Sequence, residues 1–540
     1  KYRITDVQLA NGYIKNITLE SSDGTKLGKS IAAKVFIDCT YEGDLMAKAG
    51  VSYIIGREDN KQYGETYNGV QLMKGHQFPD GVDPYKIKGD STSGLLWGIS
   101  PAALSSDGTG DKLVQAYNYR ICLTDNPANK IEITRPENYD STKYELLLRL
   151  FDAQPNKRKL NHYFIWSRMP NNKTDINNRG GFSTDMIGMN HNYPEASYEE
   201  RAEIIKAHKD YTQGLLYFYK TDPRVPQELR DEIQAWGYPK DEYTEDNHWS
   251  PQLYIRESRR MTGDYVMTQA HCEGRETVTD GIGMAAYTMD SHNCQRLLVK
   301  KDGKYIVKNE GNVEIGGGLP YPISYRSIIP KEEECKNLLV PVCLSASHIA
   351  YGSIRMEPVF MVLAQSAAIA AAEAINTGSV QTVDIKKVQA LLHENPLLDD
   401  SFSEILIDDS ELDLSINNDW EVIKKQGGYG PTFLKSKVRN GSPVRFSPHM
   451  EHEGKYKVYT YYHMRKDISP AITYSISNGI DSWTRVIHKD SVRIEGQTTG
   501  EWIELGTYNF QKSSMPYIEI STGDTSGAVI ADAVLFIPVK

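Results

Sequence analysis

The chain has 540 residues, which is too long for one ordinary core and predicts a multidomain protein. Its 61 basic and 71 acidic residues give a net charge of −10, which argues against nucleic-acid binding and favours a small molecule or a neutral polymer as partner. The six cysteines lack the close Cys/His spacing of a zinc site, so we predict free thiols and no metal site.

The first forty residues predict antiparallel hairpins, because short β-branched runs are broken by Asn11-Gly12 and Ser22-Asp23-Gly24. An apolar strand at residues 33–38 follows, and its pattern is typical of a strand covered on both faces. A turn and a short helix with Gly43 and Asp44 come next.

The middle of the chain, residues 51–319, is rich in Tyr, Asn, Pro and charged residues. Capping-box spacings at Thr142 with Glu145 and at Ser197 with Glu200 predict helix starts, and a further helix is expected from Pro226 to Gly237. We therefore predict a large, mostly helical insertion that caps a core.

A second buried strand is predicted at residues 338–343, followed by a polar turn with His348 and Arg355 and a helix from Pro358 to Gly378. This helix is alanine-rich and interrupted by polar residues, which suits a buried helix of a soluble protein better than a membrane span.

The last part of the chain predicts an all-β sandwich at residues 405–540, after an acidic linker at residues 396–404. Hydrophobic residues alternate with period two, and turns are expected at Asn478-Gly479 and Glu495-Gly496.

These segments resemble the family of bacterial FAD-dependent oxidoreductases, some of which are labelled xanthan lyases, over residues 1–376. The motifs that carry the resemblance are VFIDCTYEGDL at 35–45, RESRR at 256–260, DSH at 290–292 and the segment at 337–372. The C-terminal part is similar to the sandwich that ends golvesin- and xanthan-lyase-like proteins. The implied fold class is α+β or α/β, with an FAD-binding-like core formed by residues 1–50 and 320–395, the insertion at 51–319, and then the sandwich.

The chain departs from the family pattern at one place. Members open with a strand, a G-x-G-x-x-G turn that admits the pyrophosphate, and a helix. No such unit precedes Tyr2, and the one string with similar spacing, Gly281-Ile-Gly283, follows no apolar strand, so we interpret it as a turn. We expect an incomplete FAD-binding-like domain and a product that purifies without stoichiometric FAD.

The resemblance also implies site residues. Contacts with FAD are expected from the two strand ends and the following helix, at Asp38, Thr40, Gly43, Asp44, Ser345, Ser347 and Gln365. Catalytic candidates are two histidines that could transfer protons and two arginines that could stabilise negative charge: His292, Arg326, His348 and Arg355. A lone histidine is more often structural, Asp44 could simply favour a helix N-terminus, and RESRR most simply forms a salt-bridge network.

Three functions remain open. The favoured one is an FAD-dependent oxidoreductase acting on a small-molecule or carbohydrate-derived substrate. A polysaccharide lyase would need a base and a cation, for which Tyr325, His348 and Arg326 are candidates. A non-catalytic carbohydrate-binding protein would use aromatic residues of the sandwich, Trp420, Tyr429, Trp483 and Trp502, although such tryptophans are more often core. The sandwich suggests a secreted or periplasmic protein, and the oligomeric state is left open.

Overall fold

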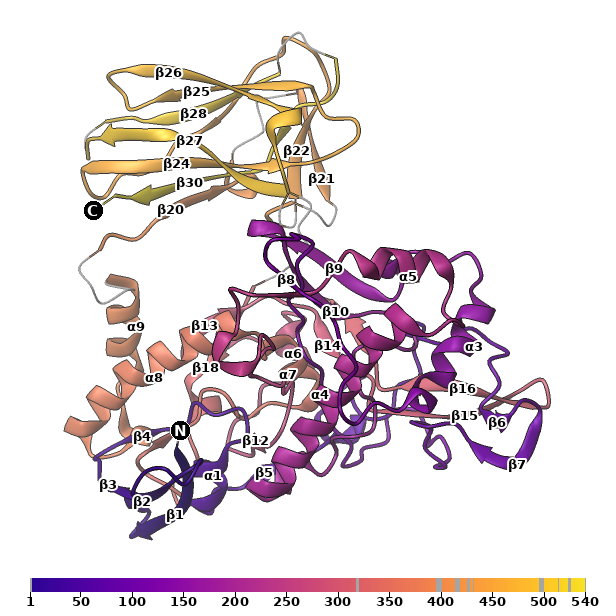
Figure 1. Cartoon of the computed structure of the whole chain (residues 1–540). Coiled ribbons are helices and arrows are strands. Elements are labelled where there is room, and N and C mark those ends of the chain that lie inside the picture. The colour runs from indigo at the N-terminus through magenta and orange to yellow at the C-terminus, as the bar shows by residue number, and fades with distance from the viewer. Residues whose placement is uncertain are drawn as a thin grey trace. The chain divides into compact units, whose positions relative to one another are not determined.

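The computed structural model describes residues 2–316, 320–394, 401–412, 418–424, 428–430, 432–494, 500–512, 514–522 and 526–539. The chain forms two compact units, Lys1–Gln389 and Ala390–Lys540 (Figure 1). All six cysteines are free thiols, as predicted, and Cys39 is exposed.

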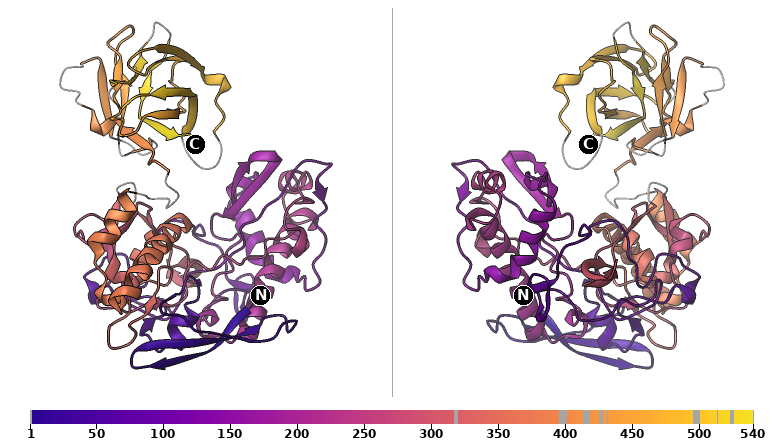
Figure 2. Two further views of the ribbon diagram at one scale, coloured as in Figure 1. Left: turned by 90° about the vertical axis from the view of Figure 1, so that its left-hand side faces the viewer. Right: turned by 90° about the vertical axis from the view of Figure 1, so that its right-hand side faces the viewer.

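The first unit opens with the predicted hairpin. Strands β1 (Tyr2–Ala10) and β2 (Tyr13–Ser21) pair antiparallel around Asn11-Gly12, and β3 (Lys29–Ile31) adds to β2. Figure 2 shows this small sheet along one edge of the unit. The following strand β4 (Phe36–Ile37) pairs in parallel with β19 (Leu338–Leu339), so two segments about three hundred residues apart lie side by side before helix α1 (Asp44–Lys48).

The insertion contains fewer helical residues than predicted. Its helices are α2 (Asn60–Tyr63), α3 (Glu145–Ala153), α4 (Tyr198–Thr221), α5 (Gln227–Gln234) and α6 (Gln269–Cys272). Its strands are β5 (Tyr53–Ile54), β6 (Tyr85–Ile87), β7 (Asp90–Leu95), β8 (Lys130–Ile131), β9 (Phe164–Met169), β10 (Lys173–Asn178), β11 (Tyr238–Pro239), β12 (Arg260–Met261), β13 (Gly281–Ala285), β14 (Met289–Ser291), β15 (Gln295–Lys301), β16 (Lys304–Glu310) and β17 (Val313–Ile315). These strands are mostly too short to give a clear alternation in sequence, and they form antiparallel pairs.

One predicted helix start is confirmed and another is wrong. Ser197 and Glu200 form the expected capping box of α4, with Ser197 N–H donating to Glu200 Oε2 at 2.8 Å. At the other site, Asp140 caps a 3-10 turn, and α3 begins only at Glu145. Asp140 is the capping residue instead of Thr142, because its side chain accepts the N–H of Thr142 at 3.0 Å.

The first unit closes with β18 (Tyr321–Ser324) and three helices, α7 (His348–Ile354), α8 (Glu357–Thr377) and α9 (Ile385–Glu394). The predicted helix from Pro358 to Gly378 is therefore confirmed, with Gly378 as its left-handed C-cap. Among the described residues, α8 is the one helix long and apolar enough to cross a membrane by length and composition, and 39% of its most apolar window is buried.

Helix α8 packs closely on β13, which decides the fate of the glycine string. A Cβ on Gly283 would lie 3.0 Å from Val362 Cγ1, and Ser366 donates its hydroxyl to the Ile282 carbonyl at 2.6 Å. Gly281-Ile-Gly283 thus lies in strand β13, which ends at Ala285, and the predicted turn is wrong. The glycine serves close helix–strand packing.

The second unit is all-β, as predicted. One sheet has the order β20 (Ile405–Asp408), β30 (Ala533–Pro538), β24 (Gly454–His463) and β27 (Gly500–Phe510). Another has the order β23 (Val444–Phe446), β28 (Tyr517–Ser521), β25 (Ala471–Ser477) and β26 (Ser482–His488), and a third joins β21 (Trp420–Lys424), β22 (Thr432–Ser436) and β29 (Ile530–Ala531). Asn478-Gly479 lies between β25 and β26, whereas the turn predicted at 495–496 and linker residues 396–400 lie outside the described residues.

Candidate functional site

Three of the four predicted catalytic residues lie around the junction of α7 and β14. Close packing of these elements is possible because residue 352 is a glycine, whose Cβ would otherwise approach the Asp290 carbonyl to 2.7 Å. The junction brings His348 to Ser291 and Arg355 to Asp290. Arg326 lies elsewhere, half exposed, where it pairs with Asp280.

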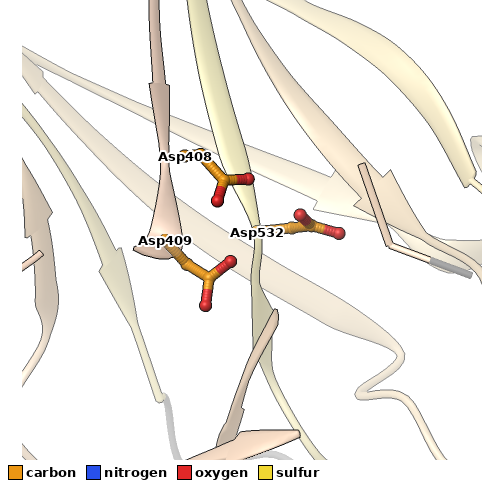
Figure 3. A group of neighbouring side chains, drawn as sticks. All are labelled: Asp408, Asp409 and Asp532. Atoms are coloured by element: carbon orange, nitrogen blue, oxygen red, sulfur yellow. The ribbon is translucent and has the colours of Figure 1, made fainter. Parts of the chain in front are cut away.

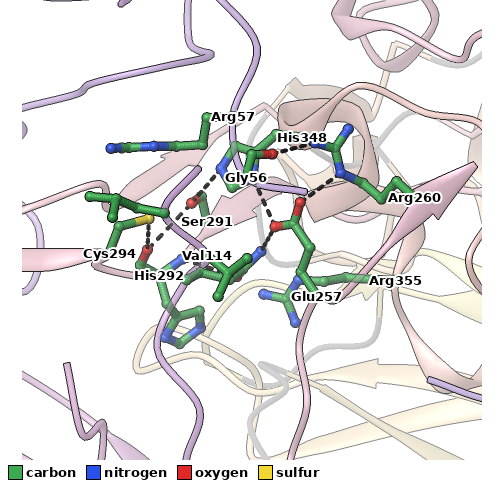
Figure 4. Close-up of polar contacts among 12 residues, drawn as sticks. Gly56, Arg57, Val114, Glu257, Arg260, Ser291, His292, Cys294, His348 and Arg355 are labelled. Carbon is green, nitrogen blue, oxygen red and sulfur yellow. Dashed lines mark hydrogen bonds and ion pairs between the residues drawn. The ribbon is translucent and has the colours of Figure 1, made fainter. Parts of the chain in front are cut away.

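His348 is held on every polar side (Figure 4). Its Nδ1 lies 2.7 Å from Glu257 Oε2, its Nε2 lies 2.9 Å from Ser291 Oγ, and its backbone N–H donates to Glu58 Oε2 at 2.9 Å. Burial acts to raise the pKa of Glu257, but His348 and Arg260 offset it and lower that pKa to about 2. The Ser–His–Glu order resembles that of an activated nucleophile, yet Ser291 is fully buried, so a substrate has no access to it.

Arg260 joins this cluster from the RESRR motif. Its Nε donates to Glu257 Oε1 at 2.7 Å and its Nη1 to Glu58 Oε1 at 2.5 Å, while two backbone carbonyls, of Gly56 and Ala346, accept two of its other three protons. The guanidinium is fully buried. The predicted salt-bridge network is therefore confirmed, and it is internal rather than solvated.

His292 differs from His348 because one ring nitrogen remains available. Its Nδ1 lies 2.8 Å from Asp185 Oδ2, whereas its Nε2 lies 3.6 Å from Asp290 Oδ2, which is longer than a hydrogen bond. Burial alone would raise the pKa of Asp185, but Arg256 and His292 hold it below its ordinary value. The ionised carboxylate can only accept, so Nδ1 carries a proton, and a neutral ring has its lone pair at Nε2.

Arg355 completes what we call the His292 site, namely Asp185, Tyr254, Asp290, His292 and Arg355. Its Nη2 donates to the Asp290 carbonyl at 3.0 Å, its Nη1 lies 3.4 Å from the Tyr254 hydroxyl, and its Nε has no hydrogen-bond partner in the described residues. The side chains of Asp290 and His292 are 15% and 11% exposed. The site is thus mostly buried but reaches solvent.

The predicted cofactor residues near β4 have their polar atoms satisfied by the protein. Asp38 Oδ1 accepts the N–H and hydroxyl of Thr40 at 3.0 and 2.7 Å, and Oδ2 accepts the Met46 N–H at 3.0 Å. Thr40 Oγ1 accepts the N–H of Gly43, whose φ is +66°. These residues shape the turn that follows β4.

Asp44 and the two serines are engaged in the same way. Asp44 forms a bidentate pair with Arg201 at 2.7 and 3.0 Å and also pairs with Arg259 at 2.8 Å. Ser345 Oγ accepts the Gly263 N–H at 3.1 Å, and Ser347 caps α7. Gln365 lies partly exposed on α8.

The cavities of the first unit include two that bear on the site. One of about 450 Å³ at the end of β4 is lined by Asp38, Thr40 and Asp44 together with the β1–β2 hairpin and α4. A larger one of about 1090 Å³ is lined by residues such as Met186 and His191 and contains none of the predicted site residues. Of these two cavities, the first touches the predicted cofactor region.

The start of α8 offers donors of the type that an electron-rich ligand requires. The N-cap residue, Met356, makes no side-chain capping bond, and Arg355 directly before it has the unpartnered buried Nε described above. The Tyr41 hydroxyl, from the turn after β4, reaches Glu357 Oε1 in the first turn at 3.5 Å. The guanidinium of Arg355 suits a flavin or another anionic group. The first turn of α8 contributes less, because it contains the acid Glu357 and Pro358, which has no N–H.

The sequence interpretation missed several residues of these clusters. Glu257 and Asp290 stand inside the quoted motifs, so their position was visible but their role was not. Tyr254 and Gln115, whose amide donates to Glu257 Oε2 at 2.8 Å, carry no signal in the sequence.

Comparison with known families agrees with this geometry. The family model for FAD dependent oxidoreductases matches residues 1–392, well over half of the chain. The chain belongs to this family. The model for the Golvesin C-terminal domain matches residues 405–538 of this FAD-dependent oxidoreductase family member, which covers the described strands of the all-β unit. Both parts of the resemblance seen in the sequence are confirmed.

Solved structures give only weak likenesses. Xanthan lyase from Paenibacillus is 22% identical, with 26% of this chain and 13% of that chain covered and a TM-score of 0.22. An exo-β-1,3-galactanase from Phanerochaete chrysosporium is 14% identical, with 25% and 29% covered and a TM-score of 0.20. A Podospora anserina GH26-CBM35 mannanase is 11% identical, with 25% and 28% covered and a TM-score of 0.20. No curated protein matches the chain.

Proposed function

We propose that the first unit is a flavin-linked oxidoreductase that oxidises a hydroxyl-bearing small molecule or carbohydrate derivative at the His292 site. The observation that carries the proposal is the Nε2 of His292, which makes no hydrogen bond of ordinary length among the described residues and lies 3.6 Å from Asp290 Oδ2, beside Arg355 at the edge of solvent. His348 is the weaker candidate for a base because both its ring nitrogens are engaged. The family match supports the reaction class.

FAD, when bound, supplies the acceptor for the two electrons of the oxidation. In the protein, the Arg355 guanidinium would hold its negative charge. His292 Nε2 accepts the proton of the substrate hydroxyl, while Asp185 fixes the ring through Nδ1. Arg256 Nη2 lies 3.0 Å from Asp185 Oδ1 and keeps that carboxylate ionised. Asp38, Thr40 and Gly43 act by shaping the turn after β4 rather than by contact.

The oxidation is tested with the full chain and added FAD. Anaerobic mixing with panels of alcohols, sugars and uronic acids should bleach the flavin band for the substrate. We expect His292→Asn to slow the bleaching by roughly 100-fold or more, within the range for loss of a general base. The variant should also lose the rise in rate with increasing pH that a general base produces. His393→Asn, at the exposed end of α9, is the matched control. Equal rates in His292→Asn and the wild type would refute the assignment.

Flavin binding is tested separately. Because Gly281-Ile-Gly283 lies in β13, it supplies no phosphate-binding turn, and we expect the purified 540-residue protein to contain less than one FAD per chain. An absorbance spectrum with a full flavin band would contradict this expectation. A titration with FAD then measures the affinity of wild type and His292→Asn alike, so that failed binding is distinguished from failed chemistry.

The lyase alternative has no comparable geometry. Tyr325 is buried and donates to the Val380 carbonyl at 2.8 Å, His348 contacts Glu257, and Arg326 pairs with Asp280. These three residues bond three different sets of partners.

A second candidate function, carbohydrate binding by the second unit, is favoured by one aromatic cluster. Tyr429, which is 46% exposed, lies with its ring 5.3 Å from that of Trp502, and Tyr461 lies 5.4 Å from Trp502. Trp420 and Trp483 differ, because the first is buried and the second packs on Tyr508. Aromatic rings with an exposed face suit sugar stacking.

Binding is checked by the retardation of the protein in gels that contain polysaccharide. Trp502→Ala should abolish the retardation, and Tyr459→Ala on β24 should leave it unchanged. If Trp502→Ala is retarded as strongly as the wild type by the same polysaccharide, the Tyr429–Trp502 surface is not the sugar-binding site. The Golvesin C-terminal domain also supports a secreted or periplasmic location, which cell fractionation measures directly.

A further inference from the structure

Three aspartates meet at one end of the second unit, where the first and last strands pair. Asp408 ends β20, Asp409 follows it, and Asp532 precedes β30; the pairing of Asp408 with Ala533 brings the ends together. One carboxylate oxygen of each lies within 4.8 Å of the others (Figure 3). The three residues are 9%, 1% and 0% exposed.

The hydrogen bonds to these carboxylates leave their charge uncompensated. Asp532 accepts the Tyr429 N–H at 3.0 Å, and Asp409 accepts the Thr432 hydroxyl at 3.0 Å. Asp408 Oδ1 accepts from Ser410, whereas its Oδ2 is buried and has no hydrogen-bond partner among the described residues. No lysine or arginine among the described residues pairs with any of the three aspartates. An isolated buried carboxylate is costly, so this arrangement requires a proton or a cation.

Two glycines lie against the carboxylates of the cluster. A Cβ on Gly430 would lie 2.7 Å from Asp408 Oδ2, and one on Gly428 would lie 2.9 Å from Asp532 Oδ2. The glycines therefore keep the backbone close to the carboxylates with no side chain between them.

We propose that Asp408, Asp409 and Asp532 bind a calcium ion. All the donors are oxygens, which excludes the softer ligand sets of zinc and copper, and calcium accepts irregular sets of carboxylates with backbone carbonyls and water. The ion ties the ends of β20 and β30 to the turn with Gly428 and Gly430. That turn carries Tyr429, so calcium binding also orders the Tyr429–Trp502 pair.

The test uses the full chain, freed of metal with EDTA and then titrated with calcium chloride. Calorimetry should show that calcium raises the unfolding midpoint of the second unit only, by an amount that grows with the logarithm of its concentration above Kd. Titration calorimetry measures the Kd, and tryptophan fluorescence reports the order of the Trp502 environment. Magnesium at the same concentration should give a smaller rise, because it requires stricter octahedral geometry.

Two variants separate a cation site from a merely structural cluster. Asp532→Asn should weaken calcium binding at least tenfold, and yet without calcium it should melt no lower than the wild type, because one buried charge is removed. Glu421→Gln, an exposed acid on β21, should respond to calcium like the wild type. The proposal is overturned if calcium leaves the wild-type midpoint unchanged, if Asp532→Asn keeps the full response, or if magnesium matches calcium.

Discussion

Glu257 is the residue whose neutralisation tests the buried network most directly. Its two oxygens accept from Arg260 Nε at 2.7 Å, His348 Nδ1 at 2.7 Å and Gln115 Nε2 at 2.8 Å. Glu257→Gln preserves the shape of the side chain but removes its charge and replaces one acceptor with an NH2 donor. Arg260 then retains Glu58 as its one carboxylate partner. The new NH2 group also faces at least one of the N–H donors that the Glu257 carboxylate accepted.

Two arguments give similar values for the loss of unfolding free energy. The pKa of Glu257 falls from the ordinary 4.5 to about 2, and a difference of this size corresponds to about 3 kcal/mol of unfolding free energy. Removal of one partner from a buried ion pair costs roughly 3–5 kcal/mol. We therefore expect Glu257→Gln to lower the stability of the first unit by about 3 kcal/mol at pH 7.

Calorimetry of the full chain is the suitable assay, because it should resolve separate transitions for the two units. Only the transition of the first unit should move, and Glu137→Gln, an exposed acid of the same unit, should move neither. A depressed carboxyl pKa stabilises the protein above the unfolded value, so the difference should stay constant above about pH 4.5 and narrow towards pH 2. A loss of less than about 1 kcal/mol at pH 7 would refute the reasoning, since buried-pair removal should exceed it.

Three further predictions concern other positions of the first unit. Burial lowers the pKa of His208 to about 4, so the neutral ring stabilises the fold above pH 6.5. The free energy of unfolding should fall by about 2 kcal/mol between pH 7 and 5, and chemical denaturation of His208→Phe should show a weaker dependence of stability on pH. Gly43→Ala should cost about 1–2 kcal/mol by thermal unfolding, because φ is +66° and the new Cβ would lie 3.1 Å from Cys343 Sγ. Gly352→Ala should push α7 away from Asp290, so flavin bleaching should slow clearly while the melting temperature falls only slightly. An unchanged bleaching rate would contradict the proposed site.

Local patterns were sufficient where structure depends on neighbours in the chain. The hairpin at Asn11-Gly12, the capping box of α4 and the alternation in β24 all form as predicted, because each depends on residues a few positions apart. The pattern failed at residues 281–283, where the glycines serve a strand against α8 and not a turn.

Site prediction followed the same division. The motifs indicated which histidines to consider but could not rank them, since the ranking depends on partners from distant segments. His348 is engaged by Glu257 and Ser291, while the Nε2 of His292 makes no hydrogen bond of ordinary length among the described residues and lies beside Asp290. Likewise, Asp38 and Asp44 stand where a cofactor was expected but bond to Met46 and Arg201.

The cluster of three aspartates shows the limit most clearly. Spacing in the sequence offered no ligand set, because Asp408 and Asp532 are far apart in the chain, and only the pairing of the first and last strands of the second unit joins them.

The sequence by itself determined the family, the two-part organisation and the elements whose signals are local. The tertiary structure decided which polar groups are satisfied and which remain available, because burial and long-range pairing set hydrogen bonding and charge, and neither is written in residue order.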